Sequence, residues 1–298
     1  MYKQKFEDYL ILECNYSKLT VKAYLSDIND FENFYIVNID NQLNWIEVMY
    51  PDIRNWIVSL VENGISNRSI NRKTASLKSF YLFLQKIEVV KKNPLSKHKT
   101  LRVEKKVQLP FSEKEMNNVF EEFSEETENY GNLRDRLIIE VFYTTGIRRA
   151  ELIDLKVSSV DLSNKIIKVL GKRNKERLIP LLEHTIPLFR KYINVYSSGY
   201  KVDNSSFLFV TNKGVKLYET FVYRLINSYF AKVSVKIKKS PHILRHSFAT
   251  HLLKNGADLN AVKDLLGHSS LGATQVYIHN EISQLTKVYK NAHPRNKK

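Results

Sequence analysis

Cysteine is almost absent from this chain of 298 residues, which holds only Cys14. One cysteine excludes a disulfide framework and a cysteine-based zinc cluster, and it fits a reducing cytosol. The chain also lacks any run of about 18 uncharged apolar residues, a signal-peptide-like start, a basic amphipathic helix and a lipidation motif. We therefore expect a cytoplasmic protein with no membrane partner.

Acidic residues are too few to balance the basic ones. The chain has 47 Lys and Arg against 31 Asp and Glu, a formal net charge of +16. Such an excess attracts polyanions, and nucleic acid is the commonest polyanion in a cytosol. At 43% hydrophobic residues the chain is too apolar to be disordered, and its length suits two domains.

The positive charge is concentrated between two parts of the chain. Residues 1–67 carry 5 basic and 10 acidic residues, whereas residues 68–106 carry 12 basic residues against Glu88 and Glu104. A solvated linker would look similar, but basic residues also occur on the helix expected before it. We interpret the stretch as a clamp that follows DNA phosphates.

Apolar spacing predicts a helical N-terminal part. Four helices are expected within residues 1–90, the second with Ser17 as its N-cap, the third opened by Pro51 and ended by Gly64, and the fourth capped by Ser66. Residues 91–108 show neither the helical nor the strand spacing of apolar residues, and they hold a proline. They therefore predict a basic linker. Residues 109–298 are expected to form a second domain.

The second domain is predicted to be mostly helical with one small sheet. Ser112 and Glu115 form a capping-box pattern, and a long apolar helix ends at Gly146. The period then changes: residues 166–169 and 178–179 predict a β-hairpin, and residues 207–210 another short strand. Helices are expected again up to Gly256, up to Gly267 and near 281–291.

The residues needed to break a phosphodiester lie at marked places in this half. That reaction needs a nucleophile, positive charge on the non-bridging oxygens and a proton for the leaving oxygen. The candidates are Arg148 just past Gly146, Lys172 at the hairpin tip, His242 and Arg245 three residues apart on a helix, His268 behind Gly267, and Tyr277 nine residues later. Singly, each suits a structural role; the joint spacing favours a site.

Together these segments resemble the tyrosine recombinase (phage integrase) family, and within it the bacterial Xer-type chromosome-dimer resolvases. The boxes of the family are matched by Thr145–Leu152 (TGIRRAEL), Gly171–Arg177 (GKRNKER), His242–His246 (HILRH), and by Leu266, Gly267, His268, Thr274 and Tyr277. The N-terminal pattern is met by Ser17, Thr20, Tyr24, Asp27, Ile28 and Phe31. Arg173 stands where the family usually has glycine, which leaves the hairpin turn open.

The resemblance implies a fold and a mechanism. The fold would be mainly α with a small β-sheet: an all-α SAM-like core-binding domain, then an α/β catalytic domain. Arg148 and Arg245 would grip the phosphate, His242 and His268 would donate hydrogen bonds to it, and Lys172 would protonate the leaving 5′ oxygen. Tyr277 would form a 3′-phosphotyrosyl intermediate, without metal or cofactor, while Glu151 would orient a catalytic side chain.

The partners implied are double-stranded DNA with a partly palindromic site, a homo- or hetero-tetrameric synapse, and a DNA translocase. The expected DNA contacts are Ser66, Arg68, Arg72, Lys73, Lys78, Lys91, Lys92, Lys175 and Arg177. A chromosome dimer would be resolved at a dif-like site.

Four alternatives stay open. Residues 258–277 can be interpreted as a helix-turn-helix of a non-catalytic regulator. A type IB topoisomerase or a mobile-element integrase would share the phosphotyrosine chemistry; the lack of an added N-terminal arm-binding domain favours the Xer type. His242 and His246 could bind zinc, but position 243 is Ile where a zincin has Glu.

Overall fold

The protein is described from a computed structural model that covers residues 2–104, 108–123, 129–171, 176–236, 238–267 and 278–296, with side chains from residue 285 in the last range. It divides into two compact units, residues 1–106 and 107–298, each described by itself. Of the helices in these ranges, none has the length and apolar character needed to cross a bilayer.

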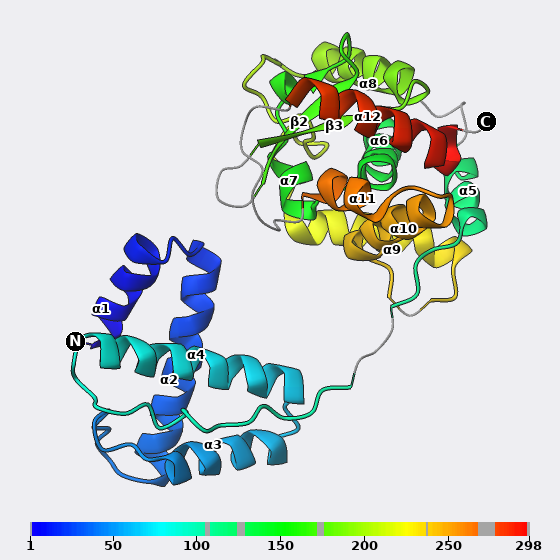
Figure 1. The fold of residues 1–298 in the computed structure, drawn as a ribbon. Helices are drawn as coiled ribbons and strands as arrows, with labels where there is room; N and C mark the ends of the chain where they lie inside the picture. The colour runs from blue at the N-terminus through cyan, green and yellow to red at the C-terminus, as the bar shows by residue number, and fades with distance from the viewer. Residues whose placement is uncertain are drawn as a thin grey trace. The chain divides into compact units, whose positions relative to one another are not determined.

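The first unit is all helical, as the sequence predicts (Figure 1). Helix α1 (Tyr2–Asp8) continues into a π-helical turn, η1 (Tyr9–Glu13), and is followed by α2 (Lys18–Asn38), α3 (Tyr50–Glu62) and α4 (Asn67–Lys86). Ser17 and Ser66 cap α2 and α4 by accepting main-chain N–H bonds. The inner stripe of α4, from Ile70 to Leu84, is buried in one aromatic-rich core.

The segment after α4 packs on the first unit up to residue 104. Leu95 is fully buried in the core of that unit. The Asn71 side chain binds both main-chain groups of Leu101, at 2.8 Å each, and the Asn67 amide donates to the carbonyl of Arg102 at 2.8 Å. The first part of the expected linker is therefore held along α4 by hydrogen bonds between asparagine side chains of α4 and the linker main chain, which an apolar-period analysis does not detect.

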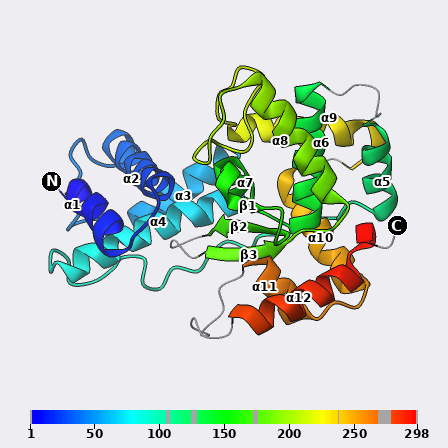
Figure 2. The ribbon, with the colours of Figure 1, turned by 90° about the horizontal axis from the view of Figure 1, so that it is seen from above.

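The second unit surrounds one large core with helices and a small sheet (Figure 2). Its helices are α5 (Glu113–Glu121), α6 (Tyr130–Thr145), α7 (Arg149–Asp154), α8 (Thr185–Gly199), α9 (Glu219–Val233), α10 (Pro241–Lys254), α11 (Leu259–Leu266) and α12 (Ile278–Ala292). Ser112 and Glu115 form the predicted capping box. The central helix α6 is buried almost throughout and lies against α8 and α10.

The sheet is antiparallel, in the order β1 (Val160–Asp161), β2 (Ile166–Leu170) and β3 (Glu176–Pro180). The register Ile167↔Ile179 and Val169↔Arg177 confirms the predicted hairpin. β1 is too short to give an alternating pattern and was not predicted. The strand predicted at residues 207–210 is wrong in detail: Phe207 and Val210 form isolated bridges.

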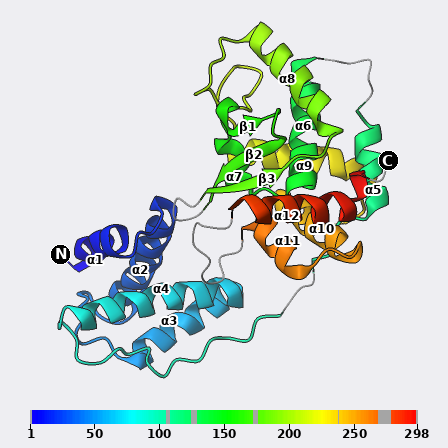
Figure 3. The same ribbon diagram turned by 45° about the horizontal axis from the view of Figure 1, so that its top comes forward.

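The end of the chain is docked within the second unit (Figure 3), where α12 contacts β3, α10 and α11. Tyr289 is fully buried, and its hydroxyl donates to the carbonyl of Thr144 on α6 at 2.5 Å. The Glu140 carboxylate, also on α6, accepts 2.8 Å hydrogen bonds from Arg295 Nη2 and His184 Nε2. Burial raises the pKa of Glu140, but these hydrogen bonds and charges outweigh it and lower the pKa overall.

Candidate active site

Arg148 is placed by a helix break and by hydrogen bonds that it donates to Glu151. Helix α6 ends at Gly146, and Arg148 is the N-cap of α7 in extended conformation. Its main-chain N–H donates to Glu151 Oε2 at 2.8 Å, and its Nη1 donates to Glu151 Oε1 at 2.7 Å. Its Nη2 donates to the carbonyl of Gly267, just past α11, at 3.0 Å. The guanidinium is thus oriented from two sides.

Arg245 comes to the same place from α10. Its Nη2 donates to the carbonyl of Leu266 at 2.6 Å, and its Nη1 donates to the carbonyl of Gly146. Both acceptors lie at helix C-termini, where unsatisfied carbonyls and the helix dipole favour a cation. The ends of α6 and α11 therefore hold Arg148 and Arg245 side by side.

The two glycines at these helix ends allow the close approach. Gly146 and Gly267 have φ angles of 60° and 64°, in the left-handed region. A Cβ at Gly146 would lie 2.4 Å from Cδ1 of Phe248, and one at Gly267 would lie 2.9 Å from Cδ of Arg177. A larger residue at either position would move a helix end that carries an arginine acceptor.

Glu151 lies at the centre of the arginines. Its side chain is 6% exposed. The carboxylate accepts a 2.8 Å hydrogen bond from each η nitrogen of Arg177, in addition to the bonds from Arg148. Burial raises the pKa of Glu151, but hydrogen bonds from Arg177 and Arg148 and the charge of Arg177 outweigh it, so the pKa falls to about 2. Glu151 is therefore an anion across the physiological pH range.

The surroundings of Arg245 favour an incoming anion. Burial, and then the like charge of Arg148, lower the pKa of Arg245 to about 10; Arg177 adds to this effect, and Glu151 opposes it. A phosphate bound here would relieve that repulsion through charge-assisted, bidentate hydrogen bonds. Chemically, the arrangement is suited to binding a phosphoryl group and stabilising the charge that develops on it.

The structure brings together Arg148, Glu151, Arg177 and Arg245 of the predicted site. His242 is exposed in the first turn of α10, one turn before Arg245. Lys172, Lys175, His268 and Tyr277 lie outside the described residues. Their places in the chain are between β2 and β3 for the lysines, directly after Gly267 for His268, and directly before α12 for Tyr277.

The predicted DNA contacts of the first unit have mixed surroundings. Ser66, Arg68, Lys91 and Lys92 are exposed, and Lys78 is half-buried. Arg72 and Lys73 instead form ion pairs with the buried Asp27 of α2, and Lys73 also pairs with Asp30. Ser76 donates to Asp27 at 2.7 Å.

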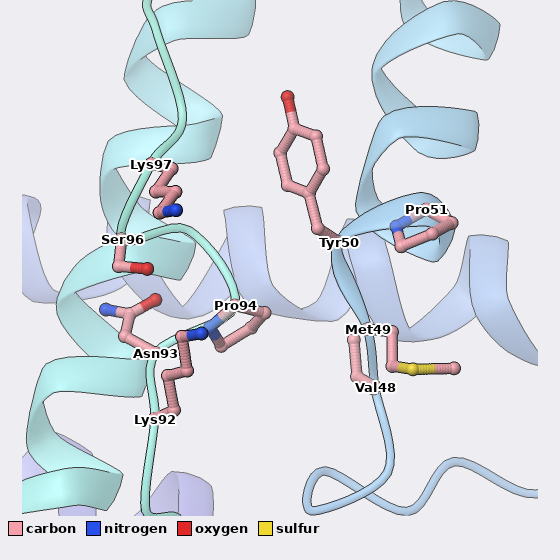
Figure 4. A pocket seen from close by; sticks show the side chains of 9 residues that line it. All are labelled: Val48, Met49, Tyr50, Pro51, Lys92, Asn93, Pro94, Ser96 and Lys97. Atoms are coloured by element: carbon pink, nitrogen blue, oxygen red, sulfur yellow. The ribbon is translucent and has the colours of Figure 1, made fainter.

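A pocket of about 500 Å³ lies in the first unit. Figure 4 shows that its walls come from two segments, residues 48–51 at the start of α3 and residues 92–97 after α4. Lys92 and Lys97 line it, with Tyr50 opposite. Its lining holds no carboxylate, histidine or cysteine, so among the described residues the arginine cluster of the second unit remains the candidate for chemistry.

Two features of the site were missed in the sequence. One is the role of main-chain carbonyls at Gly146, Leu266 and Gly267 as arginine acceptors. The other is the partner of Arg177, expected to contact phosphate but bound here to Glu151. The spacing of a glycine after an apolar helix signals the first; no local pattern signals the second, because 26 residues separate Arg177 from Glu151.

Residues 111–284 match the model of the phage integrase family, and residues 4–87 match the phage integrase N-terminal SAM-like domain. The chain therefore belongs to the phage integrase family, the tyrosine recombinases, which are DNA-recombining enzymes with a tyrosine nucleophile.

Among its relatives are proteins named tyrosine recombinase XerC. That of Chlorobaculum parvum is 38% identical, covering 98% of this chain and 94% of its own. That of Bacillus licheniformis is 36% identical, covering 97% and 95%. That of Staphylococcus epidermidis is 38% identical, covering 97% and 96%. These homologues identify a site-specific recombinase of the Xer type.

Two solved structures share the fold. The XerH site-specific recombinase bound to a palindromic difH substrate has a TM-score of 0.71 at 22% identity, over 92% of this chain and 81% of that one. The Tn1549 transposon integrase in complex with circular intermediate DNA has a TM-score of 0.71 at 19% identity, over 95% and 98%.

Proposed function

We propose that this recombinase cleaves and rejoins double-stranded DNA at a short, partly palindromic site, through a 3′-phosphotyrosyl intermediate at Tyr277. The observation that carries the proposal is the convergence of Arg148 and Arg245 on the ends of α6 and α11. Two guanidinium groups fixed on protein carbonyls and a carboxylate need no reorganisation when charge develops on a phosphate.

The chemistry assigns a role to each group. The phenol oxygen of Tyr277 gives its proton to one of the two histidines and attacks phosphorus, and the bond from phosphorus to the 5′ oxygen breaks. Lys172 gives a proton to that leaving oxygen, while His242 and His268 donate hydrogen bonds to the phosphoryl group. A free tyrosine has a pKa of about 10, so the cationic pocket must favour its phenolate as it attacks. The phosphotyrosine conserves the bond energy for rejoining.

Polar and basic residues of the first unit bind the DNA phosphates in this proposal. Ser66, Arg68, Lys78, Lys91 and Lys92 are accessible or half-buried, and Arg72 is paired with Asp27 but keeps half of its side chain exposed. Lys73 and, in the hairpin, Lys175 complete the proposed set. Such contacts to phosphates set affinity rather than sequence preference.

In the cell we propose that the enzyme resolves chromosome dimers at a dif-like site. The likeness to XerC proteins over nearly the whole chain supports this. Pairwise strand exchange requires four protomers in the synapse, and a paralogous partner and a DNA translocase are proposed as further members. Action for a mobile element is the second candidate, supported by the fold shared with a transposon integrase.

A suicide substrate tests the proposal. A duplex site from the genome of origin, nicked beside the cleavage point, loses a short fragment on cleavage and traps the enzyme. A covalent adduct released by protease is expected. Binding without adduct would favour the helix-turn-helix regulator, and relaxation of plasmid that lacks the site would favour a topoisomerase.

A further inference from the structure

Arg177 is engaged inside the protein by its whole guanidinium. It is the second residue of β3, and its side chain is 14% exposed. Nη1 and Nη2 each donate to one oxygen of Glu151 at 2.8 Å, and Nε donates to the carbonyl of Leu265 at 3.3 Å. These bonds direct the guanidinium at protein groups, and its two η nitrogens are bound bidentately to a buried carboxylate.

Arg177 completes the set of hydrogen-bond donors around the Glu151 carboxylate. Oε1 accepts from Arg148 Nη1 and Arg177 Nη1, while Oε2 accepts from the Arg148 main chain and Arg177 Nη2. Four donors occupy a carboxylate that has about four acceptor sites. The plane of the carboxylate is therefore fixed, and with it the direction of the Arg148 guanidinium.

Arg177 also joins three elements that carry different parts of the site. Its main chain belongs to the hairpin, its η nitrogens bind α7, and its Nε binds the end of α11. Gly267 leaves room for its stem, because a Cβ there would lie 2.9 Å from Cδ of Arg177. In sequence, Lys172 precedes Arg177 on the hairpin and His268 follows Gly267 directly.

We propose that Arg177 is a positioning residue of the cleavage reaction rather than a DNA contact. It fixes Glu151, and through Glu151 the guanidinium of Arg148, and it keeps the hairpin in register with the end of α11. The proposal rests on the proposed function for the reaction that is positioned. It goes beyond it in assigning to Arg177 a role exerted only through other residues.

The experiment compares Arg177→Ala and Arg177→Lys with the wild type in the full chain on the nicked duplex. Adduct formation by Arg177→Ala is expected to fall about 10- to 100-fold, as for misplacement of reacting groups by about an ångström. The affinity for the site and its salt dependence are expected to remain unchanged. Arg190→Ala, at an exposed arginine of α8, is the matched control and should cleave at the wild-type rate.

The pH profile separates positioning from simple loss of stability. Without Arg177, Glu151 loses its largest pKa-lowering partner, while burial still raises its pKa. Protonation then neutralises the carboxylate at a higher pH than in the wild type, so Arg177→Ala should lose further activity as pH falls, over a range where the wild type loses none through this group. Arg177→Lys keeps the positive charge but cannot bind Glu151 bidentately. Its activity should therefore be independent of pH over that range, as in the wild type, while its cleavage rate stays lower than that of the wild type.

Each other outcome overturns the proposal. A salt slope smaller by about 0.9 with weaker binding would make Arg177 a phosphate contact. A lowered melting temperature with an unchanged pH profile would make it a structural residue. Failure of the wild type to form any adduct would instead contradict the proposed function itself, so the two failures are distinguishable.

Discussion

Arg245 Nη2 donates a hydrogen bond to the carbonyl oxygen of Leu266 at 2.6 Å. Leu266 is the last residue of α11, two positions before His268. A short bond from a half-buried arginine to this carbonyl couples α10 to the segment that leads to His268 and Tyr277. Arg245, the proposed phosphate ligand, and the end of α11 are therefore expected to move together.

The pairing of α2 with α4 depends on Asp27. Its side chain is 2% exposed and meets Arg72, Lys73 and Ser76. We expect Asp27→Ala to lower the free energy of unfolding of the first unit by about 3 kcal/mol, because removing one partner leaves buried donors unmatched. Asp30→Ala, at a half-exposed partner of Lys73, should cost about 1 kcal/mol or less.

Tryptophan fluorescence in a urea titration measures this change selectively, since Trp45 and Trp56 are the two tryptophans of the chain and both lie in the first unit. Equal effects of Asp27→Ala and Asp30→Ala would contradict a special role for the buried carboxylate.

Tyr277→Phe should bind the site with wild-type affinity and form no covalent adduct on a nicked duplex, because it lacks the phenol oxygen that we propose as the nucleophile. Gel shift and denaturing electrophoresis measure the two properties on one sample. Tyr223→Phe, at a partly exposed tyrosine of α9, is the control and should form adduct normally. An adduct with Tyr277→Phe would move the nucleophile to another residue.

Cleavage should persist in excess EDTA. The expected reason is that guanidinium groups, rather than a bound cation, neutralise the phosphoryl oxygens in the transition state. Adduct yield with and without chelator is the measurement. Activity that is lost and then restored by zinc or magnesium would sink the mechanism and revive a metal site at His242 and His246.

Neutralising Lys91, Lys92, Lys97 and Lys99 together should weaken binding to all DNA sequences alike. These lysines are exposed after α4. The slope of log affinity against log salt should flatten by about 0.9 for each phosphate contact that is lost. Titrations of specific and random duplexes at several salt concentrations test this. An altered site preference at constant slope would show base contacts instead.

Lys172→Ala should cleave ordinary DNA about 10² to 10⁴ times more slowly, as expected for loss of a general acid. It should recover on a duplex whose leaving 5′ oxygen is replaced by sulfur, because a thiolate leaves without a proton. Arg245 is proposed to bind the phosphoryl oxygens, so Arg245→Ala should gain much less activity from the sulfur substitution. Rescue of Lys175→Ala in place of Lys172→Ala would assign the acid to Lys175.

Local signals in the sequence predicted local structure well. Ser17, Ser66 and Ser112 cap helices where their patterns place them, and Gly146 and Gly267 end helices in the left-handed conformation. These features depend on a few neighbouring residues, and short-range hydrogen bonds decide them.

Pairings between distant segments could not be predicted in the same way. The position of Arg177 in the predicted hairpin suggested a DNA contact, yet it binds the carboxylate of Glu151, 26 positions earlier in the chain. Lys73, which we propose as a DNA contact, also pairs with Asp27 and Asp30 on α2, and nothing near it in the sequence indicates these partners. Which of several surface-compatible charges turns inward depends on how helices pack, and that is a tertiary property.

The buried side chain of Tyr289 anchors α12, the helix that begins directly after Tyr277. Tyr277 stands directly before α12, and Tyr289 fastens that helix to Thr144. Eleven helical steps separate residue 278 from this anchor, roughly 17 Å at 1.5 Å per residue. The start of α12 at residue 278 is therefore held at this distance along the helix from the contact with α6, unless Tyr289 is withdrawn from Thr144.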